Sequence, residues 1–392
     1  MSKTPGRILA TLLLITASIL FADLGFTGAY RIIKGYAPLL QTDYRIQHPL
    51  YHHDFQSCSP AQVDYWGRNR YVMVTNSLGF RDSRRRNIDP AQSDSSILVI
   101  GDSFTEGIGV NFEHTFVGIA DSQVDAEILN AGVSSYSPII YFQKLKYLIE
   151  ELQLKPRHVF VYLDISDIRD EARAYRWGES GNIVGNKGHS NSYHESSQDK
   201  SSSCGHALAL NFDDPLTQYF TLLPVALQFR QWKDHFMERY NRYLEHLNNS
   251  ETVSDRTLMR NVVAVNQAQW TVDKAQFDDY GQTGLARASE HMSLLADLLR
   301  QHDIGLTIAV YPWPTQIWHN DLNSPQVSHW QQWAKEHHSG FINYFDDLVS
   351  RDDAQAIRNI SNYYIKGDMH FNHEGNKLIA QRLINAINAL PN

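Results

Sequence analysis

Short apolar runs that end at a glycine or a polar residue recur along the middle and the C-terminal part of the chain. Residues 97–100 are Ile-Leu-Val-Ile and lead directly into Gly101. A run of this kind is typical of a strand that is buried on both faces of a parallel sheet. The same pattern returns at residues 127–129, 159–163 and 305–311. We therefore predict strands of a parallel sheet at these places.

Segments with the hydrophobic periodicity of helices lie between the predicted strands. Residues 139–152 form a predicted helix between the second and the third strand, and an apolar stripe at three- and four-residue intervals precedes the fourth. Asn372 can cap a last helix. Strands that alternate with helices predict the α/β class. The stripe before the fourth strand consists of Leu285, Ala288, Met292, Leu295 and Leu299, and that of the last helix of Ile379, Leu383, Ile387 and Leu390.

The N-terminus has the pattern of an export signal. Lys3 and Arg7 precede an uncharged run at residues 8–22, like the positive and apolar regions of a signal sequence. Continued to residue 30, the segment reaches roughly the 20 residues that a membrane-spanning helix needs. We predict that residues 1–30 are a signal-anchor or transmembrane segment, with cleavage as the alternative. The rest of the chain would then lie outside the cytoplasm, in the periplasm if the cell is Gram-negative.

The remaining chain divides by composition into two parts, the second of which contains an insertion. We expect an N-terminal extension at residues 31–95, ending in a polar surface loop, and a main domain at residues 96–392 whose core begins after that loop. The strand and helix alternation is interrupted at about residues 175–280, which predicts an insertion. It contains a Gly/Ser/Asn-rich tract at residues 178–203, expected to be a mobile loop, and an amphipathic helix at residues 216–247.

The bulk composition excludes two classes of protein. With 42% hydrophobic residues among 392, the chain has enough apolar side chains for a core, which excludes disorder of the whole chain. A formal net charge of −8 argues against a protein that neutralises a phosphate backbone, so we expect no nucleic-acid partner. Cys58 and Cys204 permit one disulfide in an exported protein, and two free thiols are the alternative.

A candidate nucleophile directly follows the first predicted strand. Ser103 stands in the sequence Gly-Asp-Ser-Phe-Thr-Glu-Gly at residues 101–107. Its side chain is therefore expected at the carboxyl end of a parallel strand, where ligands bind in open α/β sheets. A serine in this context can also be a simple helix cap.

A candidate base and its partner lie near the C-terminus. Asp368 precedes His370 by two residues in a polar turn ahead of the last helix, so both side chains can reach one site. Histidine suits a base because its unperturbed pKa is about 6.5. The carboxylate would bind the second ring nitrogen and stabilise the imidazolium. Because the chain has 18 histidines, a surface histidine without a chemical role is the alternative.

Together these segments resemble the SGNH (GDSL-like) hydrolase superfamily, whose first motif is Gly-Asp-Ser and whose last is an Asp and a His before a C-terminal helix. The resemblance extends from about residue 97 to the end. It implies a three-layer α/β/α sandwich with a mostly parallel, flavodoxin-like sheet, and a serine esterase or acyltransferase with the triad Ser103, His370 and Asp368. Asn-Ala-Gly at residues 130–132 is similar to the second motif, which implies that the N–H groups of Ser103 and Gly132 form an oxyanion hole. No cofactor is implied.

The third motif departs from the family pattern. Where the family carries Gly-x-Asn-Asp, this chain has Asp-Ile-Ser-Asp at residues 164–167, so Ser166 stands at the position of the asparagine that donates to the oxyanion. A serine hydroxyl is a shorter donor, and the loss of one such donor typically lowers the rate about 10²–10³-fold. Asp164 and Asp167 are predicted to be structural, as caps of the next helix.

The chain has an Asp-x-His spacing, an export segment and an insertion. In these features it is similar to SGNH-type proteins that modify extracytoplasmic polysaccharides by O-acetyl transfer. We therefore expect an acyl-serine enzyme that acts on O-acyl or O-acetyl groups of envelope carbohydrate, or on small esters. Transfer of the acetyl group to a polysaccharide hydroxyl is the alternative. Trp313 and Trp318 follow the strand at residues 305–311 and can stack on a sugar, although packing is the commoner role of such residues.

Two interpretations from other classes stay open. Asp368, His370 and His373 could ligate a metal ion, together with histidines from residues 52–53 or 337–338. Alternatively, the chain could be a catalytically inactive adaptor of the cell envelope, an interpretation motivated by Ser166 in place of the usual asparagine.

Overall fold

The computed structural model describes residues 18, 44–67, 69–186, 204 and 255–391. All of these except Ser18 belong to one compact unit, Asp43–Gly205 with Asn249–Asn392. Apart from Ser18, the predicted anchor at residues 1–30 lies outside the described residues, and so does the predicted helix at residues 216–247. Within the described part of the chain, no helix is both long and apolar enough to cross a membrane. The predicted domain boundaries stay predictions.

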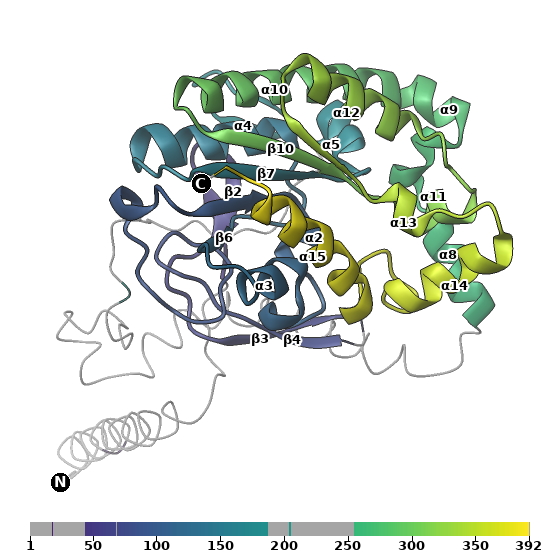
Figure 1. The fold of residues 1–392 in the computed structure, drawn as a ribbon, viewed down its shortest axis with the longest axis horizontal. Helices are drawn as coiled ribbons and strands as arrows, with labels where there is room; N and C mark the ends of the chain where they lie inside the picture. Colours follow the sequence, from purple (N-terminus) through teal and green to yellow (C-terminus); the bar gives the residue numbers. More distant parts are fainter. Residues whose placement is uncertain (1–17, 19–43, 68, 187–203, 205–254, 392) are drawn as a thin grey trace, which may run out of the picture. The chain divides into compact units, whose positions relative to one another are not determined.

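A five-stranded parallel sheet forms the centre of this unit (Figure 1). The strand order is β11-β10-β7-β5-β6, and every neighbouring pair is parallel. Counted along the chain and read from β6, this is the order 2-1-3-4-5 of flavodoxin-like sheets. The predicted α/β class with a parallel sheet is confirmed. The strands are β5 (Ile97–Ile100), β6 (Ile128–Asn130), β7 (His158–Leu163), β10 (Gly305–Val310) and β11 (Gly340–Asn343).

Helices cover both faces of the sheet. Figure 1 shows α4, α5, α10 and α12 on one face and α3 and α15 on the other, which makes three layers. Every residue of β5 and β7 is buried, as their uninterrupted apolar runs predict. The covering helices are α3 (Phe116–Asp121), α4 (Pro138–Lys146), α5 (Asp167–Arg173), α10 (Gln282–Gln301), α12 (Pro325–Glu336) and α15 (His373–Asn388).

The helices predicted within the described residues are confirmed, with shifted ends. The one predicted at residues 139–152 consists of α4 and a π-helical segment, Tyr147–Glu151. Asn372 caps α15 as predicted, because its Oδ1 accepts the Gly375 N–H at 3.0 Å. The shorter helices are α2 (Ser103–Glu106), α8 (Asp255–Val263), α9 (Lys274–Gln276), α11 (Pro314–Trp318), α13 (Phe345–Leu348) and α14 (Asp353–Tyr363). Further 3-10 or π segments are Pro90–Gln92, Phe112–His114, Asn266–Thr271 and Phe277–Gly281.

The described part of the N-terminal extension forms two antiparallel hairpins. One pairs β1 (Arg45–His48) with β2 (His52–Phe55), and the other pairs β3 (Gln62–Trp66) with β4 (Asn69–Met73). Their aromatic side chains belong to the same core cluster as the sheet, and Tyr51 and Phe55 are fully buried. The expectation that the core begins only after the polar loop is therefore wrong.

A third hairpin corrects the expectation for the Gly/Ser/Asn-rich tract. β8 (Tyr175–Trp177) pairs with β9 (Ile183–Gly185), and the Ile183 side chain is buried. Gly181 has a φ of +74° in the connecting turn, a conformation that favours glycine. The beginning of the tract is thus an ordered hairpin and not a loop, while residues 187–203 lie outside the described residues.

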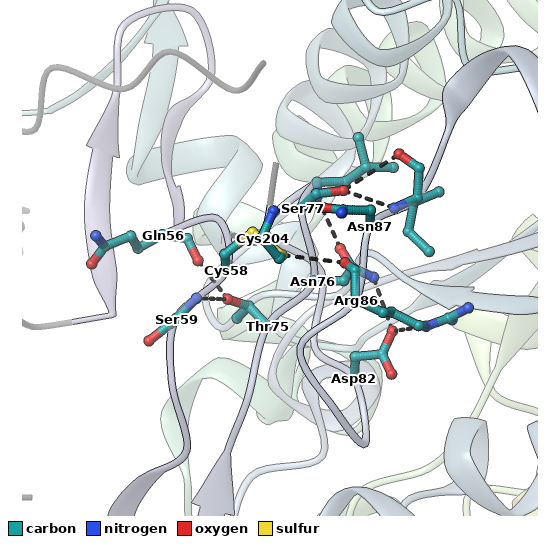
Figure 2. Close-up of a disulfide and its surroundings, with 12 residues drawn as sticks. Gln56, Cys58, Ser59, Thr75, Asn76, Ser77, Asp82, Arg86, Asn87 and Cys204 are labelled. Atoms are coloured by element: carbon teal, nitrogen blue, oxygen red, sulfur yellow. Dashed lines mark hydrogen bonds and ion pairs between the residues drawn. A yellow bond between two sulfur atoms is a disulfide. The ribbon is translucent and has the colours of Figure 1, made fainter. Parts of the chain in front are cut away.

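A disulfide joins Cys58 and Cys204, whose Cα atoms are 5.3 Å apart (Figure 2). The Cys58 N–H donates to Asn76 O at 2.8 Å, and the Cys204 N–H donates to Asn87 Oδ1 at 2.5 Å. The sequence left open whether the two cysteines form a disulfide or are free thiols, and the structure has the disulfide. The bond connects the extension to a position 146 residues further along the chain.

Candidate active site

Ser103 is the first residue of α2 and follows the carboxyl end of β5 across a tight turn. Asp102 is the N-cap of this helix, because its Oδ1 accepts the Phe104 N–H at 3.0 Å. The helix-cap alternative therefore applies to Asp102 and not to Ser103. A Cβ at Gly101 would overlap the Thr105 side chain, so the turn requires glycine. Ser103 itself is half-buried.

A tight turn before α15 brings His370 to Ser103. The Ile365 N–H donates to His370 O at 2.8 Å, and Gly367 has a φ of +79° within the turn. His370 Nε2 lies 2.8 Å from Ser103 Oγ. His370 Nδ1 lies 2.5 Å from Asp368 Oδ1, which also accepts the His370 backbone N–H at 2.8 Å. The three predicted triad side chains thus form one continuous hydrogen-bonded chain.

The electrostatics of the pair favour an ionised Asp368 beside a basic His370. Burial lowers the pKa of His370, but the Asp368 charge and hydrogen bond raise it, and the net pKa is above its ordinary 6.5. Burial raises the pKa of Asp368, whereas the charge of His370 and the hydrogen bonds from His370 and Trp66 lower it, and the net pKa is below its ordinary value. An imidazole with a raised pKa accepts a proton more readily, which suits a general base.

A buried acidic cluster adjoins Ser103 and consists of Asp102, Asp164 and Asp167. The Ser103 hydroxyl donates to Asp102 Oδ2 at 3.1 Å, so it has a second acceptor besides the imidazole. The Tyr311 hydroxyl lies 3.2 Å from Asp102 Oδ1 and 2.9 Å from Asp164 Oδ2. Burial raises the pKa of all three carboxyls, and the charge of Asp164 raises those of Asp102 and Asp167 further. The imidazole Nε2, at 2.8 Å, lies closer to Ser103 Oγ than the Asp102 carboxyl does.

Asp164 and Asp167 shape the loop after β7 instead of capping α5, which corrects the prediction for both. The N-cap of α5 is Ser166, and no side chain makes the capping bond. Asp164 Oδ1 accepts the Ser166 N–H at 2.6 Å, and Asp167 Oδ2 accepts the Asp164 N–H at 3.1 Å. Trp313 Nε1 donates to Asp164 Oδ2 at 2.8 Å. Both carboxylates have structural partners, as expected, but within the loop.

Two of the predicted oxyanion donors, Gly132 and Ser166, already have acceptors within their own loops. The Gly132 N–H donates to Asn130 Oδ1 at 3.1 Å. Ser166 is buried, and both its N–H and its side chain bind the Asp164 carboxylate. A substrate oxyanion would have to share or displace these bonds. The roles of Ser103, Gly132 and Ser166 as oxyanion donors stay predictions.

The two tryptophans after β10 differ in exposure. Trp313 is 2% exposed and is bound to Asp164, so it has the packing role that was expected to be the commoner one and not the alternative of stacking on a sugar. Trp318, at the end of α11, is 40% exposed. Only the second of the two therefore offers a ring face to a ligand.

The residues of the predicted metal site are not assembled as ligands. Both ring nitrogens of His370 already face Ser103 and Asp368. The His373 ring packs against His114, with ring centroids 4.3 Å apart. In the part of the chain that the structure describes, the group of potential metal ligands whose atoms lie within 4.8 Å of one another is Asp102, Asp164 and Asp167. It contains none of the residues of the metal-site alternative.

Residues of the extension support the site, and the sequence alone did not reveal them. Arg45 forms a partly buried ion pair with Glu106 in α2, with Nη2 and Oε1 2.5 Å apart. Glu106 Oε2 accepts the Ser134 N–H at 2.7 Å. Arg81 donates to Glu106 O at 2.6 Å. Trp66 donates to Asp368. A single arginine or tryptophan far from its partner in sequence carries no local signal of such a contact.

A pocket of about 180 Å³ adjoins the turn of Asp368. Its walls come from α8 of the insertion, from α14 and from the turn itself. Neither Ser103 nor His370 lines it, so its place beside the triad does not by itself locate a substrate. The lining residues are Met259, Val262, Ile360, Ser361, Tyr364, Ile365, Lys366, Gly367 and Asp368.

Comparisons with known proteins find similarities among solved structures only. No family model matches the chain, and no curated protein matches it. Among solved structures, it is similar to the psychrotrophic esterase EstA from Pseudoalteromonas sp., at 12% identity over 75% of this chain and 97% of that chain, with a TM-score of 0.34. It is also similar to a GDSL-like lipase from Bacteroides thetaiotaomicron, at 11% identity over 77% and 91% of the two chains, with a TM-score of 0.36.

An acetyl xylan esterase matches at 10% identity over 74% of this chain and 99% of that chain, with a TM-score of 0.38. These proteins are of the GDSL kind or are esterases. Likenesses with such low identities and TM-scores support no conclusion about this chain. The reaction and the substrate of this chain have to be inferred from its own side chains.

Proposed function

We propose that the chain is an SGNH-type serine hydrolase that cleaves ester bonds through an acyl-serine intermediate. Ser103 is the nucleophile, His370 the general base and Asp368 the carboxylate that orients the base. The observation that carries the proposal is the 2.8 Å separation of Ser103 Oγ and His370 Nε2, with Asp368 Oδ1 2.5 Å from the other ring nitrogen. Such an arrangement lets the hydroxyl lose its proton as it attacks a carbonyl carbon.

The reaction follows from the two bonds of the imidazole. Ser103 Oγ attacks the ester carbonyl carbon while its proton passes to His370 Nε2, and the negative charge of Asp368 stabilises the imidazolium. The tetrahedral intermediate collapses as His370 returns the proton to the departing alcohol oxygen, which leaves an acyl-serine. A water molecule then attacks the acyl carbon with His370 again as the base, and the acid is released.

The substrate class we propose is an O-acyl or O-acetyl group on envelope carbohydrate, or a small ester. The exposed indole of Trp318 supports a carbohydrate ligand, because a sugar face can pack on an aromatic ring. Transfer of the acyl group to a sugar hydroxyl uses the same groups, with the hydroxyl in place of water.

We also propose an extracytoplasmic location, with attachment to the membrane through residues 1–30. The Cys58–Cys204 disulfide supports the location, because disulfides persist mainly in oxidising compartments. Lys3 and Arg7 before the apolar run at residues 8–22 support the attachment. An alkaline phosphatase fusion after residue 43 should be active in a Gram-negative host, and an inactive fusion would contradict the location.

Mass spectrometry of the intact protein tests the proposed reaction. After brief incubation with p-nitrophenyl acetate, we expect a fraction of the wild-type chain to carry one acetyl group, mapped to Ser103. Addition of acceptor oligosaccharides distinguishes the two fates of this group: free acetate indicates a hydrolase, and acetylated oligosaccharide indicates a transferase. A wild-type protein that turns over the ester without acetylation of Ser103 would contradict the proposal.

A further inference from the structure

The two oxygens of Asp368 have different partners. Oδ1 accepts the backbone N–H of His370 at 2.8 Å and lies 2.5 Å from the imidazole Nδ1. Oδ2 accepts the indole N–H of Trp66 at 2.9 Å. The Asp368 side chain is 22% exposed, and each of its two oxygens has a donor from the protein.

Trp66 also contacts the base directly. Its ring stands edge-on to the His370 imidazole, with centroids 5.2 Å apart and planes at 88°. The Phe104 ring contacts the same imidazole at a centroid distance of 4.8 Å. The imidazole therefore packs against one aromatic ring from α2 and another from the N-terminal extension, and these contacts restrict its orientation.

The hairpin that carries Trp66 is held firmly against the main domain. Trp66 is the last residue of β3 and pairs with Asn69 of β4. In β4, the Val72 N–H donates to Asn111 Oδ1 at 2.9 Å. Arg81, which is 1% exposed, donates to Val110 O at 2.6 Å and thereby binds the same loop. A tryptophan on such a support has little freedom to move away from the carboxylate.

We propose that Trp66 is a positioning residue of the triad: its indole N–H fixes Asp368 Oδ2 and so keeps Oδ1 directed at His370 Nδ1. The inference rests on the proposed function and adds the N-terminal extension to the machinery of the site. Without the indole N–H, the carboxylate is held only at Oδ1, by the His370 backbone N–H and the imidazole. It can then turn more easily about its Cβ–Cγ bond, and the bond to Nδ1 lengthens. The imidazolium that forms during attack is then less well stabilised.

Substitution of Trp66 by phenylalanine removes the N–H and keeps an aromatic ring beside His370. Because this hydrogen bond goes to a charged group, we expect kcat for p-nitrophenyl acetate to fall about 10- to 100-fold. KM should stay within about twofold, because Trp66 acts through Asp368. The matched control is Trp177→Phe, which removes an indole N–H bonded to His291 Nε2 at 3.2 Å, and it should leave kcat unchanged.

The low-field proton resonance of His370 Nδ1–H gives a readout that does not depend on turnover. We expect it to move upfield in Trp66→Phe, because the bond to Asp368 weakens, and to stay unchanged in Trp177→Phe. If Trp66→Phe does not fold, benzothienylalanine at position 66 replaces the N–H by sulfur at nearly constant ring size and should give the same two changes.

The outcomes separate the two hypotheses. A wild-type protein without turnover or acetylation contradicts the proposed function, while the proton resonance still tests the role of Trp66. An active wild-type protein whose kcat is unaffected by loss of the indole N–H contradicts the role of Trp66 alone. An unchanged or downfield-shifted resonance in the variant would overturn it as well.

Discussion

Ser103 Oγ and His370 Nε2 lie 2.8 Å apart, although 267 positions separate the two residues in the chain. Ser103 follows the carboxyl end of β5. His370 lies in the turn before α15, and because α15 packs on the sheet beside α3, this turn reaches the same edge of the sheet. Ligands of open α/β sheets bind at this edge, next to the place where the strand order reverses. That place lies between β5 and β7 here.

The activity should fall as the pH is lowered through the pKa of His370. Because that pKa is raised above 6.5, the neutral base is lost at a higher pH than for an unperturbed histidine. We expect the acidic limb of kcat/KM for p-nitrophenyl acetate to have its midpoint above pH 6.5. Asp368→Asn removes the charge that raises the pKa and should move the midpoint downward. A flat profile between pH 8 and pH 5 would rule out His370 as the base.

Substitution of a triad residue should lower turnover, whereas substitution in a hydrogen-bonded Ser–His pair elsewhere in the domain should not. Ser103→Ala and His370→Ala should abolish hydrolysis of p-nitrophenyl acetate, and Asp368→Asn should lower kcat by about 10⁴-fold. The matched control is Ser289→Ala, because Ser289 Oγ lies 2.7 Å from His329 Nε2 on neighbouring helices. That variant should keep wild-type turnover. Normal turnover of Ser103→Ala would refute the assignment of the nucleophile.

The ion pair of Lys144 and Asp54, next to the Asn-Ala-Gly motif at residues 130–132, should stabilise the folded protein. Lys144 Nζ lies 3.0 Å from Asp54 Oδ1, both side chains are fully buried, and Lys144 also donates to Ala131 O at 3.1 Å. Lys144→Met leaves the Asp54 charge buried without its cation and should lower the free energy of unfolding by about 3–5 kcal/mol. Urea denaturation measures this loss.

Lys146 on the same helix provides the control for Lys144. Its Nζ lies 3.9 Å from Glu150 Oε2, and its side chain is 47% exposed. Lys146→Met should therefore cost at most about 1 kcal/mol. Equal losses in the two variants would show that the burial of the Lys144–Asp54 pair has no energetic consequence.

Reduction of the disulfide should destabilise the domain. Cys58 and Cys204 are 146 positions apart, and closure of so long a loop restricts the unfolded chain. We expect the free energy of unfolding to fall by about 2–5 kcal/mol in the presence of a reductant. In the variant with both cysteines replaced by serine, the reductant should have no effect. A native protein whose stability is insensitive to reductant would contradict the expectation.

Much of the fold and the triad followed from local sequence patterns. The apolar run of β5 together with Gly101 predicted a buried strand and a sharp turn, and the structure has both. Asp368 and His370 stood out because two chemically matched residues fall in one polar turn before a helix. In each case, the residues that specify the feature lie within a few positions of one another.

The features that sequence analysis missed depend on distant contacts. Trp66 meets Asp368 across 302 positions, and nothing near Trp66 in sequence indicates that contact. Packing is the commoner role for a residue such as Trp313, but nothing in its local sequence indicates that its indole N–H binds the buried carboxylate of Asp164. Ile183 lies in a polar tract, yet it packs into the core from a short hairpin. Burial of single side chains by remote elements leaves no periodic signal.

Labelling with a fluorophosphonate tests the central claim most directly. The reagent reacts with a serine whose hydroxyl is activated by a neighbouring base, and peptide mapping identifies the modified residue. We predict one adduct per chain, located at Ser103, no adduct in Ser103→Ala and strongly slowed labelling in His370→Ala. An unlabelled wild-type protein, or an adduct that persists in Ser103→Ala, would contradict the claim that Ser103, His370 and Asp368 act together as a catalytic triad.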